Sequence, residues 1–166
     1  MPRRSSSPHK RGPGQSRRTP PYVLSLLPAL HAEVQYSLVA SRNTSQLAVE
    51  KSLVHAHTIW ELVHHIAAWA DIARRRVEGE KVKVTPELDW PPVNDTTEGG
   101  WKESLKRLER AESELRKTTL QIPDSRLEEP AVDGGSLVYV LLHGVVQHAL
   151  YHAGQIVLLK KVLLKT

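Results

Sequence analysis

The sequence predicts an all-α fold, a four-helix bundle preceded by a disordered basic arm. Three observations lead to this prediction. Apolar residues recur at intervals of three and four over four segments, no segment alternates as a half-buried strand does, and the connecting loops are long enough for crossovers. The chain of 166 residues suits one domain with a short remainder. We therefore assign residues 1–21 to the arm and 22–166 to the bundle.

The arm is distinguished by its composition and charge. Residues 1–20 contain six basic and no acidic residues, whereas the remaining 17 basic and 18 acidic residues give a net charge of −1. The overall charge of +5 therefore comes from the arm. A segment rich in Arg, Ser, Pro and Gly buries too little apolar surface to become ordered. It either contacts nucleic acid or acidic partners weakly or serves as a solubilising tail, and without interleaved aromatic residues we favour the tail.

The composition also excludes several kinds of site. Cysteine is absent, which rules out disulfides, a thiol nucleophile and thiolate metal ligands, and leaves His, Asp and Glu as possible ligands. No apolar run approaches the ~18–20 residues that a membrane span needs. Residues 22–30 follow a basic start and superficially imitate a signal peptide, but no A-x-A cleavage site follows them. We therefore expect a soluble, cytoplasmic protein without a membrane partner.

The first two helices are predicted from their apolar spacing and end signals. Residues 22–40 have a helical apolar period, with Pro28 near the start, where proline is tolerated. A short helix is possible around residues 45–51. Thr58 and Glu61 have the spacing of a capping box, and they open a helix that continues through Val77 and ends at Gly79.

The last two helices are separated by proline-containing loops. Residues 80–100 include two consecutive prolines, which exclude a regular helix and indicate a long loop. The third long helix is predicted from Trp101 to about Leu120. After a second loop at residues 124–135, Ser136 is expected to cap the fourth helix, which continues from residue 137 to about 164.

Two histidines lie on the apolar face of the fourth helix. Steps of three and four residues along that face give Leu141, Val145, His148, His152, Ile156, Leu159 and Leu163. Two imidazoles one turn apart in a core cannot both be protonated without large desolvation and repulsion penalties. A metal ion removes this conflict, because it binds both rings in their neutral form.

The second long helix offers a third ligand. His65 shares its apolar face with Leu62, Trp69 and Ile72, whereas His64 lies on the neighbouring, more polar face. Taken alone, His65 is more often a hydrogen-bonded core histidine than a ligand. Facing an inward pair on another helix, however, it completes a predicted three-histidine metal site.

Three neutral histidines leave part of a coordination sphere for water or substrate, as in catalytic sites. Such ligands suit Zn, Ni, Fe or Co and do not choose among them. Tyr151 and Gln155 flank His152 and are candidates for positioning, with ordinary packing as the alternative. Glu61 lies one turn before His65, but the capping box explains it equally well, and the four tryptophans are expected to pack the bundle.

Several motifs together resemble the DinB-like superfamily, a group of small bacterial four-helix-bundle proteins that includes metalloenzymes. They lie at residues 58–69, 76–80, 90–92 and 143–156, and the last contains the pattern H-x-x-x-H-x-G-Q-I. The resemblance covers about residues 50–162, whereas the arm departs from the family pattern and residues 22–50 match it poorly. It implies a divalent metal bound by His65, His148 and His152.

The resemblance also implies a class of activity. Relatives include thiol S-transferases, which use the metal to activate a low-molecular-weight thiol, and metal-dependent hydrolases. Homodimers are common among them, and the family name refers to damage-inducible expression, hence to a stress response. We expect a metal-dependent enzyme that transfers a thiol to, or hydrolyses, a small molecule. The alternative is a non-catalytic bundle whose basic arm contacts nucleic acid or acidic partners.

Overall fold

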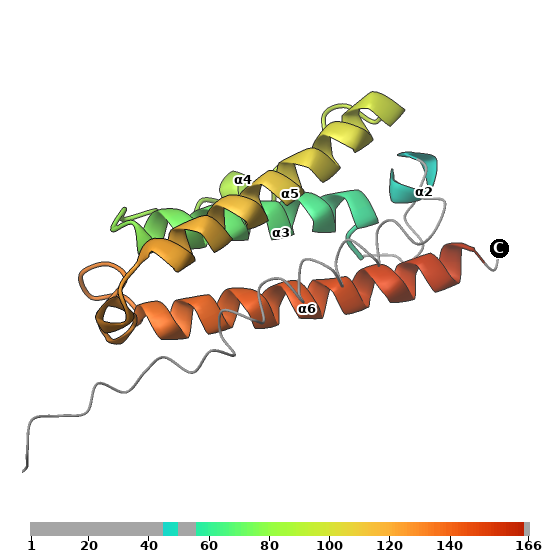
Figure 1. Ribbon diagram of the computed structural model, residues 1–166. Helices are drawn as coiled ribbons and strands as arrows, with labels where there is room; N and C mark the ends of the chain where they lie inside the picture. The colour runs from blue at the N-terminus through green and yellow to red at the C-terminus, as the bar shows by residue number, and fades with distance from the viewer. Residues whose placement is uncertain (1–44, 50–55, 165–166) are drawn as a thin grey trace, which may run out of the picture.

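The computed structural model of the protein describes residues 45–49 and 56–164. Over these ranges the chain forms α2 (Ser45–Val49), α3 (Ile59–Val77), α4 (Pro86–Asp89), α5 (Glu98–Gln121), the 3-10 helix η1 (Asp124–Glu128) and α6 (Val138–Leu163) (Figure 1). No β-strand occurs in these ranges. The predicted all-α bundle is thus confirmed, while the arm and the helix predicted at residues 22–40 lie outside the described residues.

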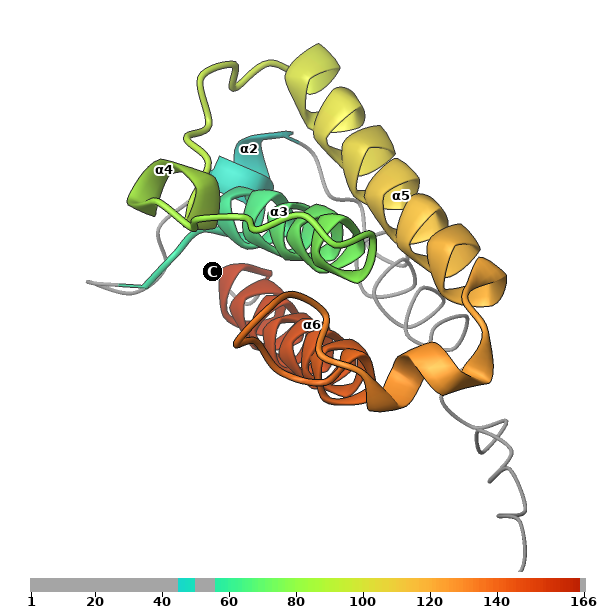
Figure 2. The same cartoon turned by 90° about the vertical axis from the view of Figure 1, so that its left-hand side faces the viewer.

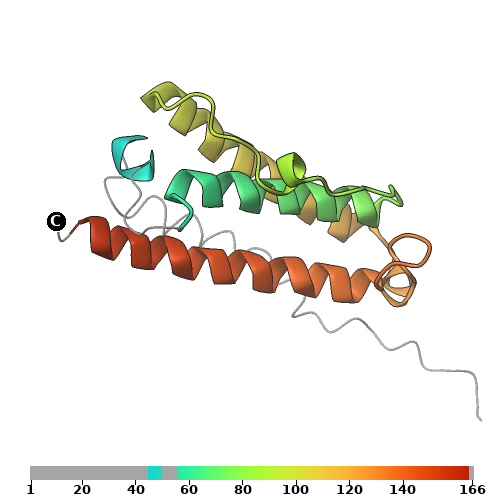
Figure 3. The same ribbon diagram turned by 180° about the vertical axis from the view of Figure 1, so that it is seen from behind.

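Helix α3 occupies the centre of the described bundle. It packs against α5 on one side and α6 on the other, as the end-on view in Figure 2 shows. Seen from behind, α3 and α6 run side by side along most of their length (Figure 3). Because α3 has neighbours on two sides, its buried residues spread beyond a single stripe. They are Ile59, Trp60, Leu62, Val63, His65, Ile66, Ala67, Ala68, Ala70, Ile72, Ala73 and Val77.

The predicted ends of α3 are confirmed. The Thr58 hydroxyl accepts a hydrogen bond from the Glu61 backbone N–H at 3.1 Å, and the Glu61 carboxylate accepts one from the Thr58 N–H at 2.7 Å. Both donors would otherwise lack a helical partner. Gly79 follows the helix with a φ of 93°, a left-handed conformation that favours glycine. Local sequence therefore fixes the register of α3.

The loop predicted at residues 80–100 is more structured than expected. It contains the single turn α4, which has Pro86 in its first turn and Thr85 as its cap, so the consecutive prolines exclude a helix only after Asp89. Helix α5 also begins earlier than Trp101. The Thr97 hydroxyl accepts a hydrogen bond from the Gly100 N–H at 3.1 Å, and this cap outweighs the low helix propensity of two glycines.

The predicted Ser136 cap of α6 is wrong. The N-cap residue is Leu137, which makes no side-chain cap hydrogen bond. The Ser136 carbonyl instead accepts a hydrogen bond from the Ala131 N–H, and the Val138 N–H donates to the Glu129 carbonyl, both at 2.9 Å. Backbone pairing across the preceding loop therefore satisfies the first N–H of the helix, that of Val138. Among the described helices, none combines the length and apolarity that crossing a membrane requires.

Candidate metal centre

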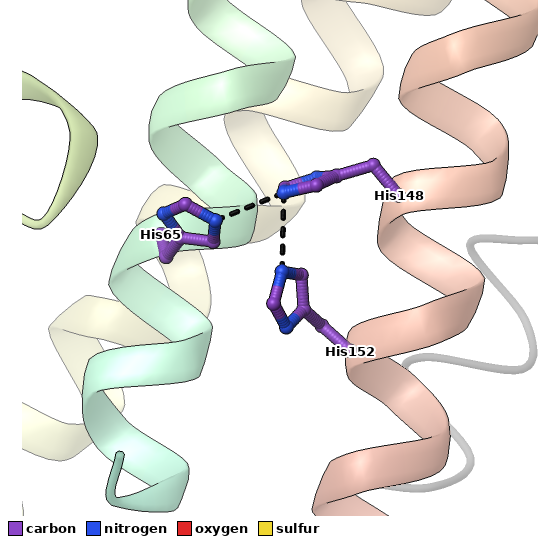
Figure 4. Close-up of side chains that lie close together, drawn as sticks. All are labelled: His65, His148 and His152. Carbon is purple, nitrogen blue, oxygen red and sulfur yellow. Dashed lines mark hydrogen bonds between the residues drawn. The ribbon is translucent and has the colours of Figure 1, made fainter. Parts of the chain in front are cut away.

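Three histidines converge in the space between α3 and α6. His65 comes from α3, while His148 and His152 lie one turn apart on α6 and point toward it (Figure 4). The Nε2 atom of His148 lies 2.9 Å from Nε2 of His65 and 3.1 Å from Nε2 of His152. One potential ligand atom from each residue lies within 4.8 Å of the other two. The fold therefore brings together the three histidines predicted from their positions on the helical faces.

The cluster is enclosed mainly by aromatic and helical packing. His65 and His152 are only 5% and 7% exposed. The indole of Trp90 stacks on the His65 ring, with centroids 3.8 Å apart and planes 7° from parallel. Trp69 lies edge-on to His65 and at a tilted angle to His148. These rings limit the directions from which solvent reaches the cluster.

In two of the three rings, the hydrogen bond made by Nδ1, the nitrogen that faces away from the cluster, shows which nitrogen carries the proton. Nδ1 of His65 lies 2.6 Å from the backbone carbonyl oxygen of Asp89, and Nδ1 of His152 lies 2.6 Å from Oε1 of Gln155. Because carbonyl oxygens only accept hydrogen bonds, both Nδ1 atoms carry the proton. In the neutral rings, Nε2 therefore presents a lone pair toward the centre of the cluster.

These positions fit a metal ion. A proton on Nε2 of His148 can be donated to Nε2 of His65 or to Nε2 of His152, but not to both. The lone pair of the other ring then faces the His148 nitrogen with no proton between them. Nδ1 of His148 is buried and has no hydrogen-bond partner among the described residues, so no protein acceptor determines which nitrogen of this ring carries the proton. An ion about 2.1 Å from each ligand nitrogen would hold those nitrogens ~3.0–3.4 Å apart. The two separations from Nε2 of His148, 2.9 Å to His65 and 3.1 Å to His152, lie close to that range.

Electrostatics favour the neutral, metal-binding form of the rings. Burial, followed by the neighbouring His152 and His65, lowers the pKa of His148 to about 4. Burial is also the main cause of the lowered pKa values of His65 and His152, against the hydrogen bonds that raise them. All three imidazoles are therefore uncharged near neutral pH, as ligands must be.

His64 is excluded from the cluster by its own hydrogen bonds. Its Nδ1 lies 3.3 Å from the Pro91 carbonyl oxygen, which makes Nδ1 the donor. Its Nε2 then accepts from the Trp60 indole N–H at 3.2 Å and lies 2.8 Å from the Ser104 hydroxyl. Both nitrogens of His64 thus have protein partners, and the residue links α3 to α5.

A short loop next to the cluster was missed by sequence reasoning. His65 and His64 bind the carbonyls of Asp89 and Pro91, on either side of Trp90, and the Trp69 indole N–H donates to the Asp89 carboxylate at 2.7 Å. Trp90 was expected only to pack the bundle, yet it forms a wall of the cluster. The sequence feature that could have indicated this role is a tryptophan followed by two prolines in an otherwise polar loop.

A pocket of about 460 Å³ opens beside His152 and Trp90. Gln155 and Tyr151, which flank His152 in the sequence, line this pocket. Gln155 accepts from His152 and donates through its Nε2 to the Tyr151 hydroxyl at 3.2 Å, so the three side chains form a hydrogen-bonded chain from the cluster to the pocket. The other lining residues are Ala56, His57, Leu62, Leu158 and Leu159.

Comparison with known families agrees with these features. The model of the DinB superfamily matches residues 23–156, which is most of the chain. The chain belongs to the DinB superfamily. This match also covers residues 23–50, where the motif resemblance was poor. No curated protein matches the chain, and no solved structure does.

Proposed function

We propose that the protein is a metal-dependent enzyme in which His65, His148 and His152 hold a divalent ion. One observation carries the proposal: three Nε2 atoms converge, and on two of the rings the proton is held at the opposite nitrogen. Three imidazoles suit Zn, Ni or Fe. A bound ion of this kind lowers the pKa of water or a thiol, or polarises a substrate oxygen.

The surrounding residues orient the ligands. The Asp89 carbonyl and Gln155 amide fix the tautomers of His65 and His152 and prevent their rings from turning. Trp90 supports His65 from one face and shields it from water. The pocket beside His152 offers space for a small substrate next to the cluster.

We favour transfer of a low-molecular-weight thiol to a small electrophile over hydrolysis. A metal-activated thiolate attacks an electrophile without a general base, whereas water attack commonly uses one. The described lining of the pocket contains no carboxylate. The Asp89 carboxylate is near His65 but accepts the hydrogen bond of Trp69. The relation to thiol S-transferases supports the same choice.

The reaction can be tested with protein loaded with Zn, Ni or Fe and a panel of electrophiles. We expect thiol consumption that requires the metal and disappears in His148→Ala, while a His64→Ala variant retains it. Parallel assays without thiol detect hydrolysis of the same compounds. Metal-loaded protein that accelerates neither reaction would overturn the proposed activity.

A further inference from the structure

The pocket beside the three histidines has a distinctive lining. Among its described residues, none carries a permanent charge. Apolar and aromatic side chains provide most of the surface, from Ala56, Leu62, Trp90, Leu158 and Leu159. We propose that this pocket binds an uncharged molecule with an aromatic or branched apolar body and one hydrogen-bond acceptor. The proposal names a substrate class and so rests on the proposed function, although binding itself does not need the metal.

The apolar walls select against charge. An ion that enters such a pocket loses hydration without gaining an opposite charge from the described lining. An apolar body, in contrast, gains by leaving water. The volume of about 460 Å³ lies in the lower part of the range for small-molecule sites and suits a body of one or two rings.

The mouth of the pocket is also apolar. Leu158 and Tyr151 are each 64% exposed, although both carry large side chains with substantial apolar surface. Both lie on α6 at the edge of the pocket, on the same side of the helix. A ligand that fills the pocket would cover part of this surface, and burial of these side chains would then contribute to binding.

The hydrogen-bond chain at the pocket determines the polar part of the ligand. The Tyr151 hydroxyl accepts from Gln155, and its own proton has no acceptor among the residues that the structure describes. Gln155 in turn has its Oε1 occupied by His152. A carbonyl, ether or epoxide oxygen on the ligand therefore fits the Tyr151 hydroxyl, next to the cluster where a reaction would occur.

A second pocket of similar size has charged residues in its lining, unlike the pocket beside the histidines. A cavity of about 450 Å³ elsewhere in the fold is lined in part by Arg76, Lys81, Lys83 and Asp133. The two cavities are similar in size but differ in charge. The absence of charge beside the histidines is thus a property of that pocket and not of every cavity in the described chain.

The test uses three probes with the same ring system: 2-naphthol, 2-naphthoate and 2-naphthylmethylammonium. Each is titrated calorimetrically into the full-length protein near neutral pH, with and without zinc. In the metal-free protein, where the described lining supplies no opposite charge, we expect 2-naphthol to bind at least tenfold more tightly than either ion. Equal affinity for the three probes, or no binding of 2-naphthol, would overturn the proposal.

Two matched substitutions on α6 locate the binding. Leu158→Asp places a charge in the pocket, whereas Leu150→Asp places one at another exposed leucine that does not line it. We expect the first to weaken 2-naphthol binding at least tenfold and the second to change it less than twofold, with both variants folded by circular dichroism. Equal effects would overturn the assignment. The probes are also titrated into metal-free protein. Loss of metal binding is therefore distinguished from loss of 2-naphthol binding in this pocket.

Discussion

His64 and His65 are adjacent in the sequence but have different surroundings. Burial lowers the pKa of both, and both use Nδ1 to bind a carbonyl of the loop that carries Trp90. They differ at Nε2. The lone pair of His64 faces the Ser104 hydroxyl and the Trp60 indole N–H, whereas that of His65 faces the nitrogen of His148. Burial and pKa therefore do not identify a metal ligand; the partner of the second nitrogen does.

The largest expected effect is the loss of metal on removal of a clustered histidine. Replacing an outer-sphere partner typically weakens metal binding ~10–100-fold, so removing a ligand itself should exceed that. We expect His65→Ala, His148→Ala and His152→Ala each to weaken Zn binding more than about 100-fold, measured by competition with a chromophoric chelator. His64→Ala should remain close to wild type. A comparable loss in His64→Ala would remove the distinction between the two neighbours.

Substitution of Gln155 tests whether fixing the tautomer of His152 strengthens metal binding. Gln155→Leu removes the acceptor for the His152 Nδ1 proton and should weaken Zn binding about 10–100-fold. Gln147→Leu is a matched control, because Gln147 is an exposed residue on the same helix. The same chelator competition measures both. Identical affinities for the two variants would show that Gln155 does not orient the ligand.

The pH dependence of the metal-free protein sharpens the comparison further. The folded-state pKa of His148 is about 4, below its ordinary value of 6.5, so the unfolded chain binds more protons between these pH values. The free energy of unfolding should therefore fall as the pH decreases from 6.5. Urea titrations at pH 7.0 and 5.5 measure the fall, which should be smaller in His148→Gln. An equal fall in both proteins would assign it to other groups.

A separate effect is expected on the folding stability of His64→Ala. This change removes the link between α3, the Pro91 carbonyl and Ser104, and we expect a loss of about 1–3 kcal/mol in the free energy of unfolding. Chemical denaturation of the metal-free variant measures it. Unchanged stability would mean that the hydrogen bonds of His64 are replaced by water without cost.

Much of the site could be predicted because it depends on local helix geometry. A period of 3.6 residues places His148 and His152 on one face, and it separates His65 from His64. Helix ends that are set by side-chain caps also depend only on residues close in the sequence, as Thr58 and Glu61 show for α3. Helix periodicity therefore identified the cluster before any tertiary contact was known.

The remaining features depend on tertiary contacts. The Asp89 carbonyl and the Trp90 ring reach His65 from a loop whose path is set by hydrogen bonds to α3. No periodic pattern marks such a path. The missed cap at the start of α6 has the same origin, because backbone groups from residues 129–131 replaced the expected Ser136 side chain.

The most direct test of the metal centre is the metal content of the purified protein, combined with X-ray absorption at the edge of the metal found. We expect close to one ion per chain, with three imidazole nitrogens at about 2.0–2.1 Å if the metal is zinc. The His64→Ala protein should give the same spectrum. Folded wild-type protein that takes up no Zn, Ni, Fe or Co, or an ion bound without these imidazoles, would contradict the account.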